Sequence, residues 1–271
     1  MMRFALTDIP PLSMRVGGLI LGIATVCSAA LLQRRSLRIP NRRTCGHLCV
    51  AAVFNIVIFS ICTPFAQLAA DTSRVAILIY TMPIWATLMA LPILGERLTT
   101  TRLLALGLCT AGMAVLIYPL ATHGIPLGLL LALAASIGWA AGTVYLKWAR
   151  LDGDPMAIVI WQLVVGLICV GAAMLIVEGL PHWWDAHIKA IGGLLVSGIV
   201  GTGVSYFLWF DIVRRLPATT ASLGVLASPV VGVVSSMLLL GERPTLADFA
   251  GFALMFAASA CVLLRPEAAR T

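Results

Sequence analysis

The chain has 271 residues, of which 61% are hydrophobic and 11% charged, and its mean hydropathy is +1.03. This composition excludes a water-soluble globular domain and favours a polytopic membrane protein. The net charge of +7 is then interpreted as a signal of membrane orientation and not of nucleic-acid binding.

Windows of about 20 residues without charge can cross a hydrocarbon core of about 30 Å as helices. The sequence predicts nine such spans. The first four cover about Val16–Gln33, Cys45–Leu68, Val75–Leu94 and Leu103–Leu120. The other five cover about Leu127–Leu146, Met156–Val177, Ala190–Val213, Ala218–Leu240 and Ala247–Leu264. The connections are short, so we expect no separate soluble domain.

One stretch of the sequence occurs twice. Pro83 opens an apolar run that ends in Leu-Gly-Glu-Arg-x-Thr at 94–99, and Pro229 opens a matching run that ends at 240–245. Each matched position is displaced by 146 residues, and no gap is needed. The chain is therefore interpreted as a duplication. We expect a first copy at 1–121 with four spans and a second copy at 122–271 with five.

The lysines and arginines alternate between the two ends of the predicted spans. Thirteen of the eighteen fall in loops on one side and five on the other. Short cytoplasmic loops are enriched in these residues, so the richer side and the carboxyl terminus are predicted to be cytoplasmic. Glu96 then falls inside and Glu242 outside, which makes the two copies inverted repeats. This architecture is typical of secondary transporters.

The paired segments resemble those of the drug/metabolite transporter superfamily, specifically the EamA type. Gly138-Trp139-Ala140 looks like the small-Trp-small signature of the helix that opens each repeat in that family. Tyr206 and Trp209 look like its pattern in the later helix of the second repeat. The resemblance covers nearly the whole chain. It implies an all-α membrane protein, a helical bundle of two inverted repeats, that often exports amino acids or other small metabolites.

The same resemblance implies ten helices, whereas nine spans are predicted here. The second copy opens with the span at Leu127–Leu146, and the first copy has no counterpart to it. We therefore expect that the first helix of the first repeat is missing, either because the true start lies upstream or because the form is truncated.

Polar and aromatic residues inside the spans are the candidates for the solute path. A buried amide without a partner costs several kcal/mol in hydrocarbon, so Asn55 and Gln162 either face a solute or join two helices by a hydrogen bond. Tyr80, Trp139 and Tyr206 each offer an apolar ring with a donor, and either line the path or fill space. We predict that Trp139, Asn55 and Tyr206 contribute to one central cavity.

Two prolines are candidates for helix kinks. Pro83 and Pro229 each remove one backbone hydrogen bond, and they either bend helices beside the cavity or satisfy packing alone. Ser228 either donates to a solute or to the carbonyl that the neighbouring proline frees. The glycines at 198, 201 and 203 are a candidate point of flexibility in the seventh span.

No acidic residue or histidine falls at the middle of a predicted span. A proton-driven carrier usually needs a titratable group there, so facilitated export or exchange is favoured. No phosphate-binding loop or nucleophile motif occurs, and Cys45, His47 and Cys49 make a poor tetrahedral set, so no cofactor and no metal are expected.

The sequence thus predicts a multi-pass carrier in the cell inner membrane that works by alternating access. We expect it to export a small neutral or zwitterionic metabolite such as an amino acid, with this solute and the lipid bilayer as partners and no nucleic acid. The oligomeric state is left open. One alternative is a polytopic membrane enzyme acting on lipid-linked substrates, which would need paired carboxylates, a histidine or a nucleophile at one interface. Another is a non-transporting membrane subunit, which would show no solute flux.

Overall fold

The computed structural model describes residues 5–39, 41–69, 75, 78–96, 99–117, 127–181, 183, 186–218, 220–221 and 246–263. These ranges are helical and contain no strand, which confirms the predicted all-α class. The elements are α2 (Pro11–Leu32), α3 (Arg42–Ala52), η1 (Val53–Ile58), α4 (Phe59–Ala69), α6 (Met82–Leu94), α7 (Thr100–Ile117), α8 (Leu127–Ala149), α9 (Pro155–Val177), α10 (Ile188–Val196), η4 (Ser197–Val204), α11 (Ser205–Arg215) and α14 (Leu246–Leu263).

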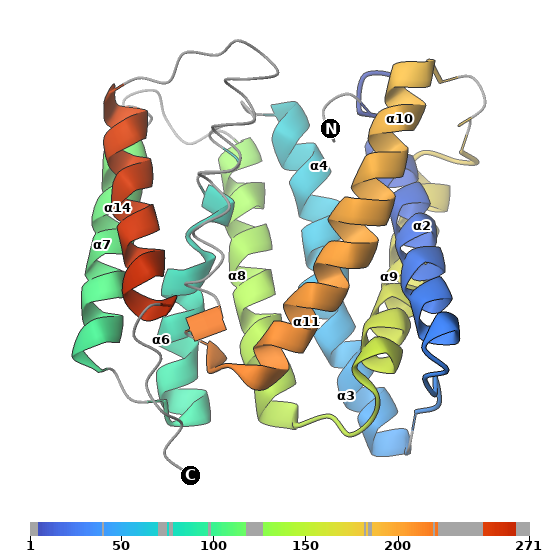
Figure 1. The fold of residues 1–271 in the computed structure, drawn as a ribbon. Helices are drawn as coiled ribbons and strands as arrows, with labels where there is room; N and C mark the ends of the chain where they lie inside the picture. Colours follow the sequence, from blue (N-terminus) through green and yellow to red (C-terminus); the bar gives the residue numbers. More distant parts are fainter. Residues whose placement is uncertain are drawn as a thin grey trace.

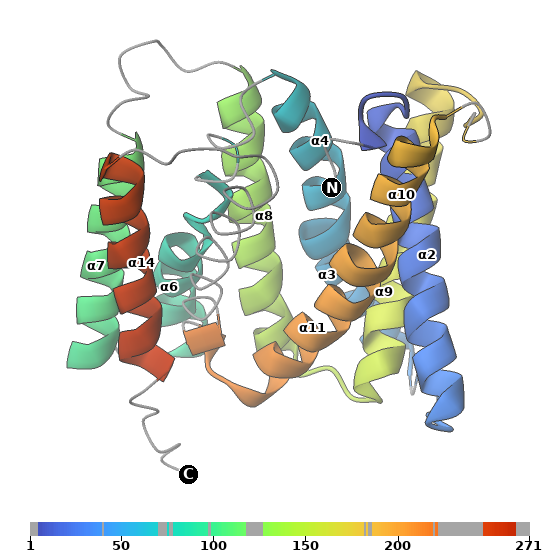
Figure 2. The same cartoon turned by 45° about the horizontal axis from the view of Figure 1, so that its top comes forward.

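Five helical segments of the described chain are long and apolar enough to cross a membrane. They are α2, α8 and α9, and the two continuous helices Arg42–Ala69 and Ile188–Arg215. The shorter α6, α7 and α14 are apolar as well. The helices stand side by side as a bundle (Figures 1 and 2), with α7 packed on α14 and α2 on α9. The predicted eighth span lies mostly outside the described residues.

The helix bounds repeat with the same displacement as the sequence motifs. Arg42–Ala69 and Ile188–Arg215 lie 146 residues apart at both ends, and so do α7 and α14. Both long helices contain a π-helical segment at the same place, η1 in the first and η4 in the second. The members of each pair run in opposite directions (Figure 1). The described helices are thus arranged as inverted counterparts.

The first helix begins earlier than predicted. The sequence predicts its start at Val16, whereas α2 starts at Pro11, because proline suits the first helical turn and a carboxylate caps this end. Glu178, which follows α9, accepts hydrogen bonds from the backbone N–H groups of Leu12 (2.7 Å) and Ser13 (2.8 Å) and from the Ser13 hydroxyl (2.7 Å). Arg15, predicted as a loop residue, therefore lies within a membrane-spanning helix.

The predicted span Val75–Leu94 is not one continuous helix, which corrects the prediction. Tyr80 and Thr81 form a turn, and α6 begins at Met82 with Pro83 in its first turn. A proline is tolerated there because its missing N–H would have no helical partner. Ser136 of α8 donates to the Ile79 carbonyl at 3.2 Å, so a neighbouring helix satisfies a backbone group at the break. Pro229 and Ser228 lie outside the described residues.

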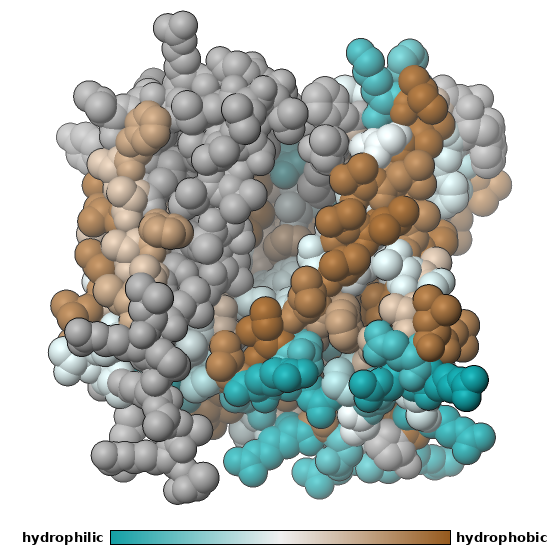
Figure 3. Space-filling model, viewed as in Figure 1, coloured by the Kyte–Doolittle hydropathy of each residue, from teal (hydrophilic) through white to brown (hydrophobic). Residues whose placement is uncertain are grey.

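The connections between helices place the basic residues at one end of the bundle. The loop residues at 33–39, 95–96 and 150–154 lie at the same end as the end of α11 (Figure 1). In Figure 3 hydrophilic side chains gather at this end, below a hydrophobic surface. Leu195, Val200 and Leu208 are among the large apolar side chains that are exposed. The apolar surface is suited to lipid, and the hydrophilic end to a membrane face.

Candidate functional site

A cavity of about 300 Å³ lies between α4, α6, α8, η4 and α11. Its wall is formed by Phe59, Ile79, Tyr80, Met82, Pro83, Ser136, Trp139, Gly201, Ser205, Tyr206 and Trp209. Four of these residues are candidates from the sequence: Tyr80, Pro83, Trp139 and Tyr206. The volume is at the lower end of the range of about 300–1,000 Å³ for ligand pockets, which suits a small metabolite.

Trp139 is at the centre of the aromatic part of this wall. It lies about 18 Å along the axis of α8, near the middle of that helix. The centre of its ring system is 4.5 Å from that of Phe59, 5.2 Å from that of Tyr206 and 6.1 Å from that of Trp209. The first two pairs are edge-to-face, a favourable arrangement for aromatic rings. The four rings offer a solute flat apolar surfaces.

Several residues of the cavity wall lie in or directly after the two π-helical segments. Phe59 follows η1 directly, Gly201 lies within η4, and Ser205 and Tyr206 follow η4. A π-helical turn contains an extra residue, so it changes which side chains face a neighbour, and such turns are frequent at functional sites. The glycines at 198, 201 and 203 signal irregularity in η4, but nothing in the sequence signals η1.

Two polar atoms around the cavity, Trp209 Nε1 and Arg15 Nε, are buried without a hydrogen-bond partner. The Tyr206 hydroxyl is buried as well and lies close to Arg15. Arg15 extends from α2 toward α4, where its Nη2 donates to Ser60 Oγ at 2.9 Å. The sequence did not single out Arg15, Ser60 or Phe59 as candidates. The signal that could have found Arg15 is a basic residue one position before the predicted start of a span.

Asn55 and Gln162 lie away from this cavity wall. Both are fully buried, and Asn55 Nδ2 donates to Gln162 Oε1 at 3.4 Å. Asn55 also packs on Gly142 of α8, where a Cβ atom would lie 2.3 Å from the Asn55 side-chain oxygen. These contacts fit the alternative in which Asn55 and Gln162 join two helices by a hydrogen bond and do not face a solute. The cavity wall contains Trp139 and Tyr206 but not Asn55, which departs from the predicted grouping.

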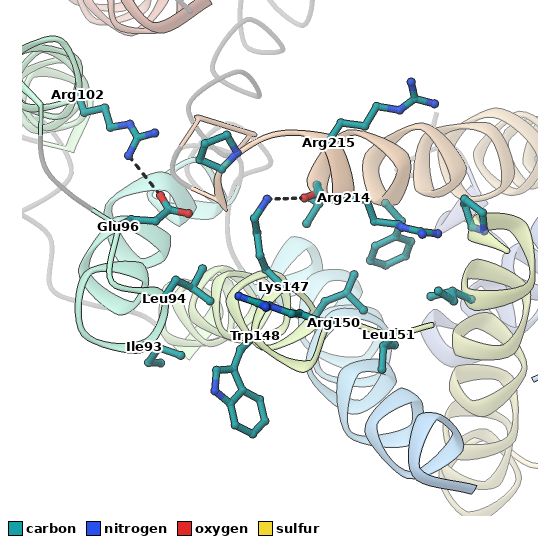
Figure 4. A pocket seen from close by; sticks show the side chains of 16 residues that line it. Ile93, Leu94, Glu96, Arg102, Lys147, Trp148, Arg150, Leu151, Arg214 and Arg215 are labelled. Atoms are coloured by element: carbon teal, nitrogen blue, oxygen red, sulfur yellow. Dashed lines mark hydrogen bonds and ion pairs between the residues drawn. The ribbon is translucent and has the colours of Figure 1, made fainter. Parts of the chain in front are cut away.

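A second pocket of about 670 Å³ lies at the basic end of the bundle (Figure 4). Five of its side chains are basic and one is acidic: Arg102, Lys147, Arg150, Arg214 and Arg215, with Glu96. Glu96, in the loop after α6, accepts a hydrogen bond from the Ala218 N–H at 2.8 Å and lies 3.6 Å from Arg102. Lys147 donates to the Val213 and Leu216 carbonyls. These contacts link α6 and α8 to the end of α11.

Metal-ligating side chains do not gather in the described part of the chain. No group of three or more His, Cys, Asp or Glu side chains is placed to hold an ion there. Cys45 and Cys49 are exposed, and His47 Nδ1 lies 2.7 Å from the Tyr145 hydroxyl.

The chain matches the EamA-like transporter family over residues 1–118 and again over 126–264. It is 24% identical to the uncharacterized transporter YoaV of Bacillus subtilis, over 90% of this chain and 84% of that protein. It is 31% identical to a probable amino-acid metabolite efflux pump of Escherichia coli, over 59% of this chain and 57% of that protein. A crystal structure with 19% sequence identity superposes with a TM-score of 0.76 over 94% of this chain and 89% of that one.

Proposed function

The chain belongs to the EamA-like transporter family, and from this premise we propose that it exports a small neutral or zwitterionic metabolite across the inner membrane. The family and the named relatives are transporters and not enzymes, so the chain is a multi-pass membrane transporter of the drug/metabolite superfamily. The solute, the direction and the mechanism are the proposal.

The aromatic cavity carries the proposal. It lies near the middle of α8 and is walled by residues of helices from both halves of the chain. Substrate sites of secondary transporters lie near the bilayer midplane, between repeats and beside interrupted helices. The turn before α6 and the two π-helical segments supply such interruptions. Alternating access then consists of one copy, 1–121, rocking against the other, 122–271.

The solute class follows from the wall and from a relative. Five aromatic side chains with few polar groups favour a solute with an apolar body over a sugar or a nucleotide. The Escherichia coli relative is named a probable amino-acid metabolite efflux pump. An amino acid with an apolar or aromatic side chain fits both the aromatic wall and the name of this relative. The basic end of the bundle is then the cytoplasmic end, from which the solute enters during export.

Efflux from proteoliposomes tests this function. Vesicles that contain the purified chain are loaded with a panel of labelled amino acids, and release is compared with that from protein-free vesicles. We expect release of apolar or aromatic amino acids above the protein-free rate. A chain that is fully folded but releases no member of the panel would instead fit a non-transporting subunit.

Substitution of Trp139 links the flux to the cavity. Trp139→Ala removes the central ring and should reduce efflux at least tenfold, because a solute loses the surface on which it is oriented. Trp161→Ala is the matched control, since Trp161 is exposed and lies outside the cavity wall. Equal efflux in the two variants, at equal amounts of folded protein, would contradict a role for the cavity.

A further inference from the structure

Arg15 is a charged residue inside a membrane-spanning helix, and it lies beside the aromatic cavity. Its Nη2 donates to Ser60 Oγ at 2.9 Å, and its guanidinium carbon is 6.0 Å from the centre of the Phe59 ring. Tyr206 lies within electrostatic reach of the same guanidinium. Because Phe59 and Tyr206 both belong to the cavity wall, Arg15 adjoins the cavity at two of its residues.

The charge of Arg15 has no acidic partner among the residues that the structure describes. The ion pairs between described residues all involve other arginines. The Nε atom of Arg15 is buried and makes no hydrogen bond. A charged side chain at membrane depth is costly and usually pairs with another group or marks a substrate pathway. An anionic ligand would supply the missing partner.

Two neighbouring side chains also offer hydrogen-bonding groups to a ligand. Trp209 Nε1 is buried without a partner, and the buried Tyr206 hydroxyl lies close to Arg15. Both residues belong to the cavity wall. An indole N–H and a guanidinium N–H can only donate, and a tyrosine hydroxyl can do so. A ligand that satisfies this set must therefore bring acceptor atoms, and oxygen atoms on an anion are the strongest of these.

The remainder of the wall limits the kind of anion. No charged side chain belongs to the described wall itself, so Arg15 supplies the single positive charge beside it. One guanidinium matches the charge and the planar, two-oxygen geometry of a carboxylate. A phosphate dianion would need a second cation. The aromatic rings suit an apolar body, and the described wall has no carboxylate to bind an ammonium group.

We propose that Arg15 binds the carboxylate of the transported solute, and that the cavity takes small monocarboxylates with an apolar or aromatic body. Ser60 holds the guanidinium in place, and the body of the solute lies against Phe59 and Trp139. An α-amino group is tolerated and not required, so the deaminated acid binds as well as the amino acid. This proposal rests on the proposed function, because it assigns the substrate class of the same cavity, and it widens that class from zwitterionic to anionic carboxylates.

Binding to the intact chain in detergent tests the class of ligand without any need for transport. The probes are 3-phenylpropanoate, phenylalanine, 3-phenylpropanamide and phenylalaninamide, and the readout is the rise in melting temperature with ligand concentration. We expect both carboxylates to bind at least tenfold more tightly than their amides. Equal binding of the acids and the amides, or binding of no probe, would overturn the proposal.

Substitution of the arginine tests the residue. Arg15→Gln should lower the affinity for 3-phenylpropanoate at least tenfold, to that of the amide, and leave amide binding unchanged. Arg15→Lys keeps the charge without the planar fork and should give an intermediate loss. Arg35→Gln is the control, since Arg35 follows the carboxyl end of α2 and pairs with Asp154. Unchanged acid binding in Arg15→Gln would overturn the proposal.

A milder variant covers the case in which Arg15→Gln does not fold. Ser60→Ala removes the hydroxyl that holds the guanidinium and should weaken acid binding severalfold while amide binding stays the same. Equal weakening of both probes would indicate a structural role and would overturn the assignment. Efflux of neutral solutes without preference for acids would contradict this proposal and leave the transport function standing. Binding of the acid without efflux would support the site and contradict transport.

Discussion

Gly142 shows how one missing side chain sets the distance between two helices. A Cβ atom at this position would lie 2.3 Å from the side-chain oxygen of Asn55, which is closer than any relaxed contact. Asn55 is fully buried and donates to Gln162, so its side chain has little room to move. The glycine therefore allows the second and fifth predicted spans to pack with an amide between them.

We predict that Gly142→Ala destabilises the protein. Forcing an extra methyl group into a packed interior costs about 1–3 kcal/mol, because neighbouring groups must shift. The matched control is Gly171→Ala in α9, where an added Cβ would meet no atom within 4 Å. That change should be neutral or stabilise by up to about 1 kcal/mol, because alanine has the higher helix propensity. Melting temperatures in detergent measure both, and equal values would contradict the prediction.

At the scale of the element, the first turn of α2 is capped by a residue from the end of another helix. The residue before it, Pro10, provides no side-chain cap, and Glu178 at the end of α9 accepts three hydrogen bonds there instead. A carboxylate is favoured at a helix amino terminus because it satisfies free N–H groups and matches the helix dipole. This contact keeps α2 helical through Arg15.

We predict that Glu178→Ala lowers the free energy of unfolding by about 1–2 kcal/mol, as the loss of a capping side chain does. Asp211→Ala is the control, since Asp211 pairs with Arg215 one turn away on α11, at the surface. Such exposed pairs contribute about 0–1 kcal/mol. Thermal unfolding in detergent compares the two. A loss in Glu178→Ala no larger than in Asp211→Ala would show that α2 needs no cap from α9.

At the scale of the whole molecule, the basic loops share one end of the bundle. Arg38 and Asp152 lie in loops at this end, whereas Lys189, at the start of α10, lies at the other (Figure 1). The charge pattern of the loops also predicts that His123 and Trp184 lie on the outer side, and both positions are outside the described residues. The structure shows that these basic loops share one end of the bundle. An excess of basic residues marks the cytoplasmic side of a membrane protein, so we assign this end to the cytoplasm.

We predict that cysteines at positions 38 and 152 are reached only from the cytoplasm and one at position 189 only from outside. All three residues are exposed. The seven native cysteines are first replaced, because Cys45 and Cys49 are exposed too. Labelling of whole cells with a membrane-impermeant maleimide should then modify position 189 alone. Labelling of position 38 from outside would reverse the orientation and undermine the proposal of export from the basic end.

The sequence by itself determined the class of protein, the duplication and three aromatic residues of the cavity. Hydropathy over about 20 residues reports a helix in lipid directly, because a spanning segment must satisfy its own backbone hydrogen bonds. A fixed displacement of 146 residues needs no structure to be seen, and the helix bounds follow it. Tyr80, Trp139 and Tyr206 were candidates because each offers an apolar ring with a hydrogen-bond donor, and the structure places all three in the cavity wall.

Only the tertiary structure decided where the polar residues point and where the helices are interrupted. Asn55 looked like a cavity residue, but it packs on Gly142 of α8 and donates to Gln162 of α9. Arg15 looked like a loop charge, because the cap that extends α2 comes from a residue far along the chain. At the turn at Tyr80, Ser136 of a neighbouring helix satisfies a backbone carbonyl. Contacts between distant residues fixed these features, and a linear pattern does not record them.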